Sequence, residues 1–258
     1  MIALVTGASS GIGRDIAKAL AKRGYDIIAV ARNIEKLNKL KEDIQQEYGK
    51  KVDIKICELT DRNAIFKLHE DVYNTYGIID VLVNDAGFGL CGMFSKTDLN
   101  KEIAMIDTNV IAMHILTKLF LQDMQQKNSG HILNVASIAG FMPGPLMATY
   151  YSTKSYVVRL TQSIRYELLK QHSNVKVHAL CPGPVDINFN KVAEVKFNLK
   201  EANSMKVAEC AVKRMLKNRI LVFPGIGIWI TRLFAKIIPD QFMARMCYMM
   251  QKRKVGKT

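Results

Sequence analysis

Short runs of consecutive apolar residues alternate along this chain with longer amphipathic stretches, and this alternation constrains its fold more than any other feature. The apolar runs, which predict strands, lie at residues 2–5, 26–31, 52–57, 79–83, 131–136 and 175–181. The amphipathic stretches, which predict helices, lie at residues 12–22, 34–48, 63–76, 101–127 and 150–171. Because the strands are apolar throughout, both faces of their sheet must be covered, as in a parallel sheet. The sequence therefore predicts an α/β doubly wound parallel sheet (a Rossmann fold), with residues 1–258 as one domain and 226–258 as a C-terminal helical extension.

Length and composition argue against several classes of protein. The 258 residues are 49% hydrophobic, which is enough apolar surface for one substantial core and argues against intrinsic disorder. No run of about 18 uncharged apolar residues occurs, so we expect no membrane-spanning helix. Five widely spaced cysteines without a Cys-x-x-Cys pair favour reduced thiols in a cytoplasmic protein over disulfides or a zinc site. A glycine turn begins at Gly7, so we expect no signal peptide before it.

A glycine-rich segment separates the first predicted strand from the first predicted helix. It reads Thr6-Gly7-Ala8-Ser9-Ser10-Gly11-Ile12-Gly13. Glycines at such a turn let the backbone approach a pyrophosphate closely, and the helix that follows presents its positive end to the phosphate charge. We therefore expect this segment to bind a nucleotide, whereas a purely structural turn is the alternative. The expected contacts come from Gly7, Ser9, Ser10, Gly11, Ile12 and Gly13.

The second predicted strand ends in Val30-Ala31-Arg32, where folds of this kind distinguish NAD from NADP. An NAD site needs a carboxylate here to accept a hydrogen bond from the ribose 2′-hydroxyl, and Ala31 supplies none. Arg32 instead offers a planar cation that suits a 2′-phosphate. This pairing favours NADP(H) over NAD(H), and an ordinary solvent-exposed arginine at a helix start is the alternative.

Three polar residues near the fifth predicted strand have the spacing of a proton-transfer site. Ser137 follows that strand directly, at the edge of a parallel sheet where ligands bind. Tyr150 and Lys154 stand four residues apart, so a helix places them on one face. A nearby ammonium favours the phenolate and lowers the pKa of a tyrosine, which can then exchange a proton with a carbonyl or an alcohol. Taken alone, a Tyr-x-x-x-Lys pair is also common on solvated helix surfaces.

Together these motifs resemble the short-chain dehydrogenase/reductase superfamily in its compact single-domain form. The resemblance covers residues 1–188 and rests on several motifs in the same order along the chain. It adds Asn109, in Asp107-Thr108-Asn109-Val110, as the fourth member of a catalytic tetrad with Ser137, Tyr150 and Lys154. Further segments resemble the cofactor-binding positions of the family: Glu58-Leu59-Thr60-Asp61, Asn84-Asp85-Ala86-Gly87 and Pro182-Gly183-Pro184-Val185. The cofactor contacts so implied are Glu58, Leu59, Asn84, Ala86, Gly87, Tyr150, Lys154, Pro182, Gly183 and Val185.

The resemblance implies a role for each member of the tetrad. Tyr150 would be the general acid in reduction and the base in oxidation, and Ser137 would donate a hydrogen bond to the substrate carbonyl oxygen. Lys154 would hold the nicotinamide ribose and lower the pKa of Tyr150. Asn109 would hold a water that connects Lys154 to solvent. No metal is implied, and the five histidines show no ligand spacing.

Three features depart from the family pattern. Asp85 replaces an asparagine in the Asn-Asn-Ala-Gly segment, which changes the hydrogen bonding expected at that turn. Ile187 stands where a threonine usually helps to hold the nicotinamide, a task that then falls to the backbone of Val185. The C-terminal third does not finish in the usual strand followed by glycine but continues further, so the resemblance implies no oligomer contacts of the common tetrameric type.

The last part of the chain is both apolar and basic. A strand that ends in a turn is predicted at residues 220–225, and two apolar patterns with helical spacing follow, at 226–238 and after Pro239. Residues 213–258 contain eleven Lys or Arg and one acid, and the whole chain carries a net charge of +14. Three interpretations stay open: helices packed on the domain or a partner subunit, a lid over a pocket for a lipophilic ligand, or amphipathic helices on an anionic membrane surface.

The expected function is an NADP(H)-dependent oxidoreductase that moves a hydride between the nicotinamide and a carbonyl or secondary alcohol. Some lipid and steroid reductases of the superfamily resemble this chain in having a hydrophobic, basic extension, which favours a lipophilic substrate. A 3-oxoacyl carrier-protein reductase is the alternative among enzymes, and a non-catalytic NADPH-binding or scaffold protein is the alternative outside them. We expect a homo-oligomer in the cytoplasm, with peripheral membrane contact as one interpretation of the tail. Nucleic-acid binding is not expected, because no recognition motif accompanies the positive charge.

Overall fold

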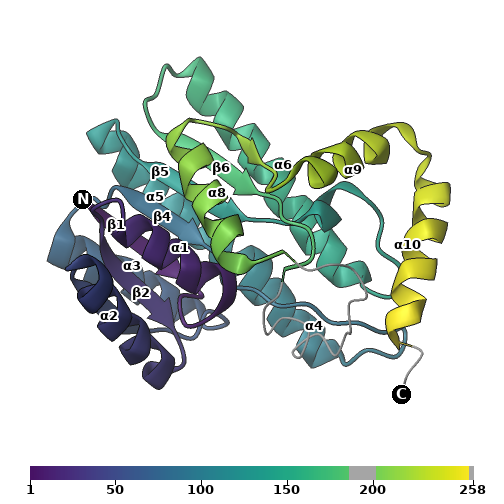
Figure 1. Cartoon of the computed structure of the whole chain (residues 1–258), viewed down its shortest axis with the longest axis horizontal. Helices are drawn as coiled ribbons and strands as arrows, with labels where there is room; N and C mark the ends of the chain where they lie inside the picture. Colours follow the sequence, from purple (N-terminus) through teal and green to yellow (C-terminus); the bar gives the residue numbers. More distant parts are fainter. Residues whose placement is uncertain (186–201, 256–258) are drawn as a thin grey trace.

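A computed structural model describes residues 1–185 and 202–255, in which seven parallel strands form one sheet covered by helices on both faces (Figure 1). The strand order is β3-β2-β1-β4-β5-β6-β7, so the connections reverse direction between β1 and β4. The strands are β1 (Ile2–Thr6), β2 (Asp26–Ala31), β3 (Val52–Ile56), β4 (Val81–Asn84), β5 (His131–Val135), β6 (Lys176–Leu180) and β7 (Leu221–Val222). This arrangement confirms the predicted doubly wound α/β fold, and ligands bind such sheets at the carboxyl ends of the strands where the order reverses.

Helices form one layer on each face of the sheet (Figure 1). One layer contains α1 (Gly11–Ala21), α2 (Ile34–Tyr48) and α8 (Ser204–Leu216), and the other contains α3 (Arg62–Tyr76), α5 (Met113–Lys127) and α6 (Ala148–Lys170). The remaining elements are α4 (Leu99–Ile106), η1 (Asp107–Ala112), η2 (Ile138–Phe141), α9 (Ile226–Ile237) and α10 (Asp240–Val255). In β1, Ala3 and Val5 pack into one layer and Leu4 into the other, all fully buried. This two-sided burial explains why the strands are apolar throughout.

The helix ends follow local side-chain chemistry, which is why most predicted boundaries lie within a few residues of the observed ones. The side chain of Asn33 caps α2 by accepting a hydrogen bond from the backbone of Lys36, and Asp61 caps α3 in the same way through Asn63. Gly49 ends α2 in the left-handed conformation, with φ of 62°.

The helix predicted at residues 101–127 has an internal irregularity. It runs through α4, a six-residue π-helical segment η1, and α5. Residues 99–127 are also the one helical stretch in the described chain that is long and apolar enough to cross a membrane. Leu116, Phe120 and Met124 are nevertheless buried in the core between α5 and the sheet, as expected for a core helix of an α/β protein.

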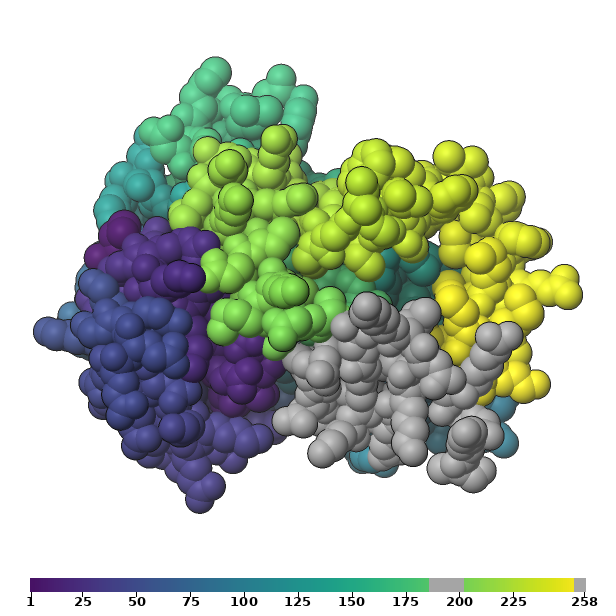
Figure 2. Space-filling model, in the orientation of Figure 1, coloured from purple at the N-terminus to yellow at the C-terminus, as the bar shows by residue number. Residues whose placement is uncertain are grey.

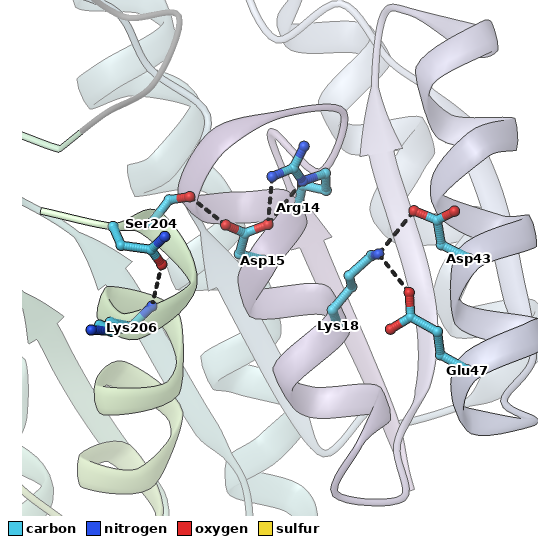
Figure 3. A network of polar contacts seen from close by, with 8 residues as sticks. Arg14, Asp15, Lys18, Asp43, Glu47, Ser204 and Lys206 are labelled. Atoms are coloured by element: carbon cyan, nitrogen blue, oxygen red, sulfur yellow. Dashed lines mark hydrogen bonds and ion pairs between the residues drawn. The ribbon is translucent and has the colours of Figure 1, made fainter.

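Helix α8 received no sequence prediction, although its buried residues repeat at helical spacing. Val207, Ala208, Ala211, Val212 and Met215 are buried on the face that packs beside α1. A polar network joins these two helices and α2 (Figure 3). In it, the buried carboxylate of Asp15 accepts hydrogen bonds from the hydroxyl of Ser204 at 2.5 Å and from Nε of Arg14 at 2.8 Å. Lys18 extends the network by pairing with Asp43 at 2.8 Å and Glu47 at 3.1 Å.

The tail adds a strand and two helices. The predicted last strand is confirmed as β7, which pairs in parallel with β6. The two apolar patterns after it form α9 and α10, on the side of the molecule away from α1 and α2 (Figure 1). The inner face of α10 is anchored by the buried residues Met243, Cys247 and Gln251.

The contacts in Figure 3 predict that removing the carboxylate of Asp15 lowers the free energy of unfolding more than removing that of Asp43. Asp15→Ala leaves Arg14 and Ser204 without their buried acceptor, so it should lower the free energy of unfolding by about 1–3 kcal/mol. Asp43→Ala removes a partly exposed ion pair and should cost less than about 1 kcal/mol. Urea unfolding of both variants beside the unmodified chain measures the difference, and equal losses would contradict the buried role of Asp15.

Candidate active site

The glycine turn lies at the carboxyl end of β1, where its backbone conformation excludes side chains. Gly7 and Gly11 have positive φ values of 70° and 58°. A Cβ atom added to Gly13 would lie 2.6 Å from the carbonyl oxygen of Gly7 and 2.5 Å from a carboxylate oxygen of Asp85. These close approaches explain why three glycines are needed at this spacing.

The turn leads into α1 in a way that fits an anionic ligand. Within the described chain, the side chain of the N-cap residue Ser10 makes no capping hydrogen bond, and the first turn of α1 contains no acidic residue. The partly exposed backbone around Ser9, Ser10 and Gly11 therefore offers unsatisfied N–H groups at the positive end of the helix. Ile12 and Gly13 are buried behind them. This cradle fits the pyrophosphate of a nicotinamide dinucleotide, as predicted from the sequence.

Arg32 and Glu58 meet at the ends of β2 and β3. Nη1 of Arg32 lies 3.2 Å from Oε2 of Glu58, and both side chains are largely exposed. Although burial opposes it, hydrogen bonds from the backbone of Thr60 and from Arg32 lower the pKa of Glu58. Arg32, which is expected to bind a 2′-phosphate, thus has the competing carboxylate of Glu58 beside it. The next residue, Leu59, is buried in the core.

The segment after β4 is held from two sides. The hydroxyl of Thr6 accepts hydrogen bonds from the backbone N–H groups of Asp85 and Ala86, at 3.2 and 3.3 Å. The side-chain Nδ2 of Asn84 donates to Thr117 and Asn134, whereas its buried Oδ1 has no hydrogen-bond partner among the described residues. Gly87, the last residue of this segment, is exposed and has no room for a side chain against Asn109.

Asn109 lies in the π-helical segment η1, where its side chain joins two elements. Its Oδ1 accepts from the backbone N–H of Phe88 at 3.0 Å, and its Nδ2 donates to the Phe88 carbonyl at 2.9 Å and to the Thr153 hydroxyl at 3.1 Å. Asn109 therefore fixes the loop after β4 to helix α6. The widened turn is common at functional sites, and sequence periodicity did not reveal it.

Ser137, Tyr150 and Lys154 converge at the end of β5. The hydroxyl groups of Ser137 and Tyr150 are hydrogen bonded. The ammonium of Lys154 lies 5.9 Å from the centre of the Tyr150 ring and donates to the carbonyl oxygen of Val135 at 2.8 Å. Ser137 is oriented further by accepting from the backbone N–H of Ala139 and donating to the carbonyl of Pro182. The structure thus brings together the four residues of the predicted tetrad.

The expected lowering of the tyrosine pKa is wrong for the residues described. Burial raises the pKa of Tyr150 to about 12; the hydrogen bond with Ser137 lowers it, and the negative charge of Asp85 raises it. Burial also lowers the pKa of Lys154 to about 8, against the opposing effect of Asp85. The sequence argument considered the ammonium and not the burial of the phenol, which is the larger effect.

Asp85 is the functional residue that sequence reasoning placed least well. Its carboxylate lies under the glycine turn, where it accepts a hydrogen bond from the backbone N–H of Gly13. Burial raises the pKa of Asp85 to about 7, although the charge of Lys154 and the Gly13 hydrogen bond oppose this. The departure from asparagine was the only signal in the sequence, and it did not show that Asp85 joins the cofactor turn to the tetrad.

The turn after β6 completes this edge of the sheet. The carbonyl oxygen of Pro182 accepts from the backbone N–H of Ile138 at 2.9 Å, and Gly183 packs against Ile228 of α9. Val185 pairs with Ala202 in an isolated parallel bridge. Ile187 lies outside the described residues. In residues 1–185 and 202–255, no group of three His, Cys, Asp or Glu side chains could hold a metal ion.

Comparisons with known proteins agree with this geometry. The short chain dehydrogenase family model matches residues 1–196. An uncharacterized oxidoreductase of Staphylococcus epidermidis is 36% identical over 186 residues, which cover 72% of this chain and 78% of that protein. The chain belongs to the short-chain dehydrogenase family.

Two solved structures are similar to this short-chain dehydrogenase over most of its length. A short-chain dehydrogenase from Sphingobium yanoikuyae in complex with NADPH has a TM-score of 0.82 at 26% identity, covering 92% of this chain and 93% of that chain. A short-chain dehydrogenase/reductase from Burkholderia phymatum in complex with NAD has the same fold, with a TM-score of 0.82 at 21% identity over 90% of this chain and 91% of that chain. The chain is thus an NAD(P)-dependent oxidoreductase of this family, as the sequence predicted.

Replacing Asp85 tests its electrostatic link to the tetrad. Its negative charge raises the pKa of both Tyr150 and Lys154, so Asp85→Asn should lower both. In alcohol oxidation, where Tyr150 must lose its proton, the alkaline rise in kcat/KM should move to lower pH by roughly one pH unit.

Asp80→Asn is the matched control, because Asp80 lies at the amino ends of the strands, far from the tetrad. There its carboxylate accepts a hydrogen bond from the backbone N–H of Ile2. A pH profile of Asp85→Asn that coincides with those of the control and the unmodified chain would contradict the link.

Proposed function

We propose that this protein is an NADP(H)-dependent reductase and dehydrogenase that interconverts a carbonyl and a secondary alcohol in a lipophilic substrate. The observation that carries the proposal is the hydrogen-bonded pair of Ser137 and Tyr150 beside the Lys154 ammonium, at the same sheet edge as the glycine turn. A non-catalytic cofactor-binding protein has no need of this buried arrangement.

The residues of the tetrad have separable tasks in this reaction. When bound, the nicotinamide supplies or accepts the hydride. In reduction Tyr150 donates its hydroxyl proton to the carbonyl oxygen, while Ser137 donates a hydrogen bond that stabilises negative charge on that oxygen. Lys154, fixed by Val135, holds the nicotinamide ribose and stabilises the phenolate that Tyr150 becomes. Asn109 keeps the loop after β4 against α6, and its expected water remains a prediction.

The NADP preference is supported by Arg32 and opposed by its neighbour. Arg32 follows β2 directly and is 77% exposed, so its guanidinium is free to turn towards a 2′-phosphate. Glu58 lies 3.2 Å away and would repel that phosphate unless Arg32 screens it. The similar structure from Sphingobium yanoikuyae contains NADPH, which supports the same choice.

Exposed apolar residues in the loop after β4, and the position of α10 beside α6, support a lipophilic substrate. Met93 and Phe94, in the loop after β4, are 53% and 69% exposed. Gln251 of α10 donates to the hydroxyl of Tyr151, next to Tyr150, at 2.8 Å. The methionine-rich helix α10 therefore lies beside the catalytic helix α6, where flexible thioethers accommodate varied apolar ligands. A homo-oligomer and a cytoplasmic location remain predictions from the sequence.

Tyr150→Phe tests the reaction. The variant lacks the proton that the carbonyl oxygen needs, so kcat for NADPH-dependent reduction should fall by about 100-fold or more. NADPH affinity, measured by cofactor fluorescence, should stay within about twofold because the phenyl ring keeps its packing. The reduction assay uses steroids, ketoacyl thioesters and simple ketones as substrates. Fastest turnover of ketoacyl thioesters would favour a 3-oxoacyl carrier-protein reductase. Tyr156→Phe, on the same helix, is the control, and undiminished kcat in Tyr150→Phe would refute the assigned roles.

A pair of variants tests the cofactor preference. Arg32→Ala removes the phosphate ligand and should raise KM for NADPH about tenfold, with KM for NADH little changed. Glu58→Gln removes the competing charge and should lower KM for NADPH. Steady-state kinetics with both cofactors measures each effect, and parallel changes for NADPH and NADH would contradict recognition of the 2′-phosphate.

A further inference from the structure

Helix α9 carries an apolar stripe that faces away from the protein. Ile226, Ile230, Phe234 and Ile237 recur at helical spacing, and Ile226 and Ile237 are 78% and 80% exposed. All of α9 is described, and none of its residues is buried. Figure 2 shows α9 and α10 together forming one side of the molecule. Burial of such a stripe is favourable only against another apolar phase.

The opposite face of α9 is attached to the domain. Ile228 contacts Gly183 in the turn after β6, and the guanidinium of Arg232 lies 5.7 Å and 5.5 Å from the ring centres of Phe141 and Phe223. The inner contacts fix which face of the helix points outward. The stripe is therefore a defined surface of the folded protein.

A basic groove of about 960 Å³ adjoins the stripe. It lies between α8, β7 and α9, and it shares Trp229 and Arg232 with α9. Its cationic lining residues are Arg23, Lys213, Arg214, Lys217, Arg219 and Arg232. Its one acidic residue, Glu209, is paired with Arg23 at 2.5 Å and with Lys22 at 3.4 Å.

The positive charge of this groove is largely uncompensated. Within the part of the chain that the structure describes, no acidic side chain pairs with Lys213, Arg214, Lys217 or Arg219. Residues 213–258 contain eleven Lys or Arg against the single acid Asp240. Like charges held close together favour an anionic partner.

We propose that α9 and the basic groove form a docking face for an anionic lipid bilayer. The stripe of Ile226, Ile230, Phe234 and Ile237 enters the interface, while the groove beside it binds the phosphate groups of the lipids. A second copy of the chain is a poorer partner, because pairing two such faces brings together two surfaces with the same strong positive charge. A free soluble anion would satisfy the groove but leave the stripe exposed. The proposal does not depend on the reaction proposed above.

Trp229 is a built-in reporter, because it is the only tryptophan in the chain and lies 46% exposed where stripe and groove meet. The full chain is mixed with vesicles of phosphatidylcholine, with or without phosphatidylglycerol. Anionic vesicles should shift the Trp229 emission to shorter wavelength and retain at least about tenfold more protein on sedimentation than neutral ones. Added salt should weaken this retention.

Variants separate the two parts of the face. Phe234→Glu should reduce retention by anionic vesicles about tenfold, since it places a charge on the stripe. Phe66→Glu is the matched control, because Phe66 is an equally exposed phenylalanine on α3 and should leave retention unchanged. Lys213→Glu with Lys217→Glu should abolish the preference for phosphatidylglycerol. Circular dichroism and NADPH binding verify that each variant is folded.

Several results would overturn the proposal. Equal retention of Phe234→Glu and Phe66→Glu by anionic vesicles would show that the stripe does not contribute to membrane binding. Equal retention of the unmodified chain by neutral and anionic vesicles would show that the groove does not bind lipid phosphates. A shift of Trp229 emission with glycerol phosphate alone, without vesicle retention, would identify a soluble-anion site instead. Concentration-dependent dimerisation in sedimentation velocity that Phe234→Glu abolishes, with no vesicle retention, would assign the face to a second copy.

Discussion

The catalytic edge of this protein depends on one buried ammonium and the carbonyl group that holds it. Lys154 donates to Val135 at the end of β5, a central strand of the sheet, so its charge is fixed relative to the neighbouring strand ends. Removal of a cation from water costs several kcal/mol unless nearby groups compensate. The carbonyl oxygen of Val135 and the carboxylate of Asp85 supply that compensation.

Asp85 makes the cofactor turn and the tetrad parts of one electrostatic unit. The same carboxylate accepts from the backbone of Gly13, at the start of α1, and lies within Coulombic reach of Lys154 on α6. An anionic cofactor bound at the start of α1 would meet this carboxylate as a like charge. The charge of Asp85 therefore connects the cofactor turn to Tyr150 and Lys154, which an uncharged asparagine at this position would not do.

The sequence predicted the sheet and three residues of the tetrad because these leave local signals, whereas Asn109 was predicted only from the resemblance to the family. A parallel strand buried on two faces must be apolar throughout, and residues four apart on a helix must share a face, so β1 to β6 and the pair of Tyr150 and Lys154 could be located. Contacts between distant segments leave no such signal. The approach of Asp85 to Gly13, the bond between Gln251 and Tyr151, and the burial that raises the pKa of Tyr150 all required the fold. Helix α8 was missed although its apolar spacing was present.

The π-helical segment η1 determines how the residues before and after it in the long helix are oriented. Asn109 must reach Phe88 and Thr153, while Leu116 and Phe120 farther along must face the core. A regular α-helix advances by about 100° per residue, so rewinding the wide turn as regular α-helix with every residue kept would rotate everything after it by roughly that angle. Either Asn109 would then face away from Phe88 and Thr153, or the apolar residues of α5 would face away from the core. The wide turn therefore lets Asn109 reach the loop after β4 and α6 while the apolar residues of α5 still face the core.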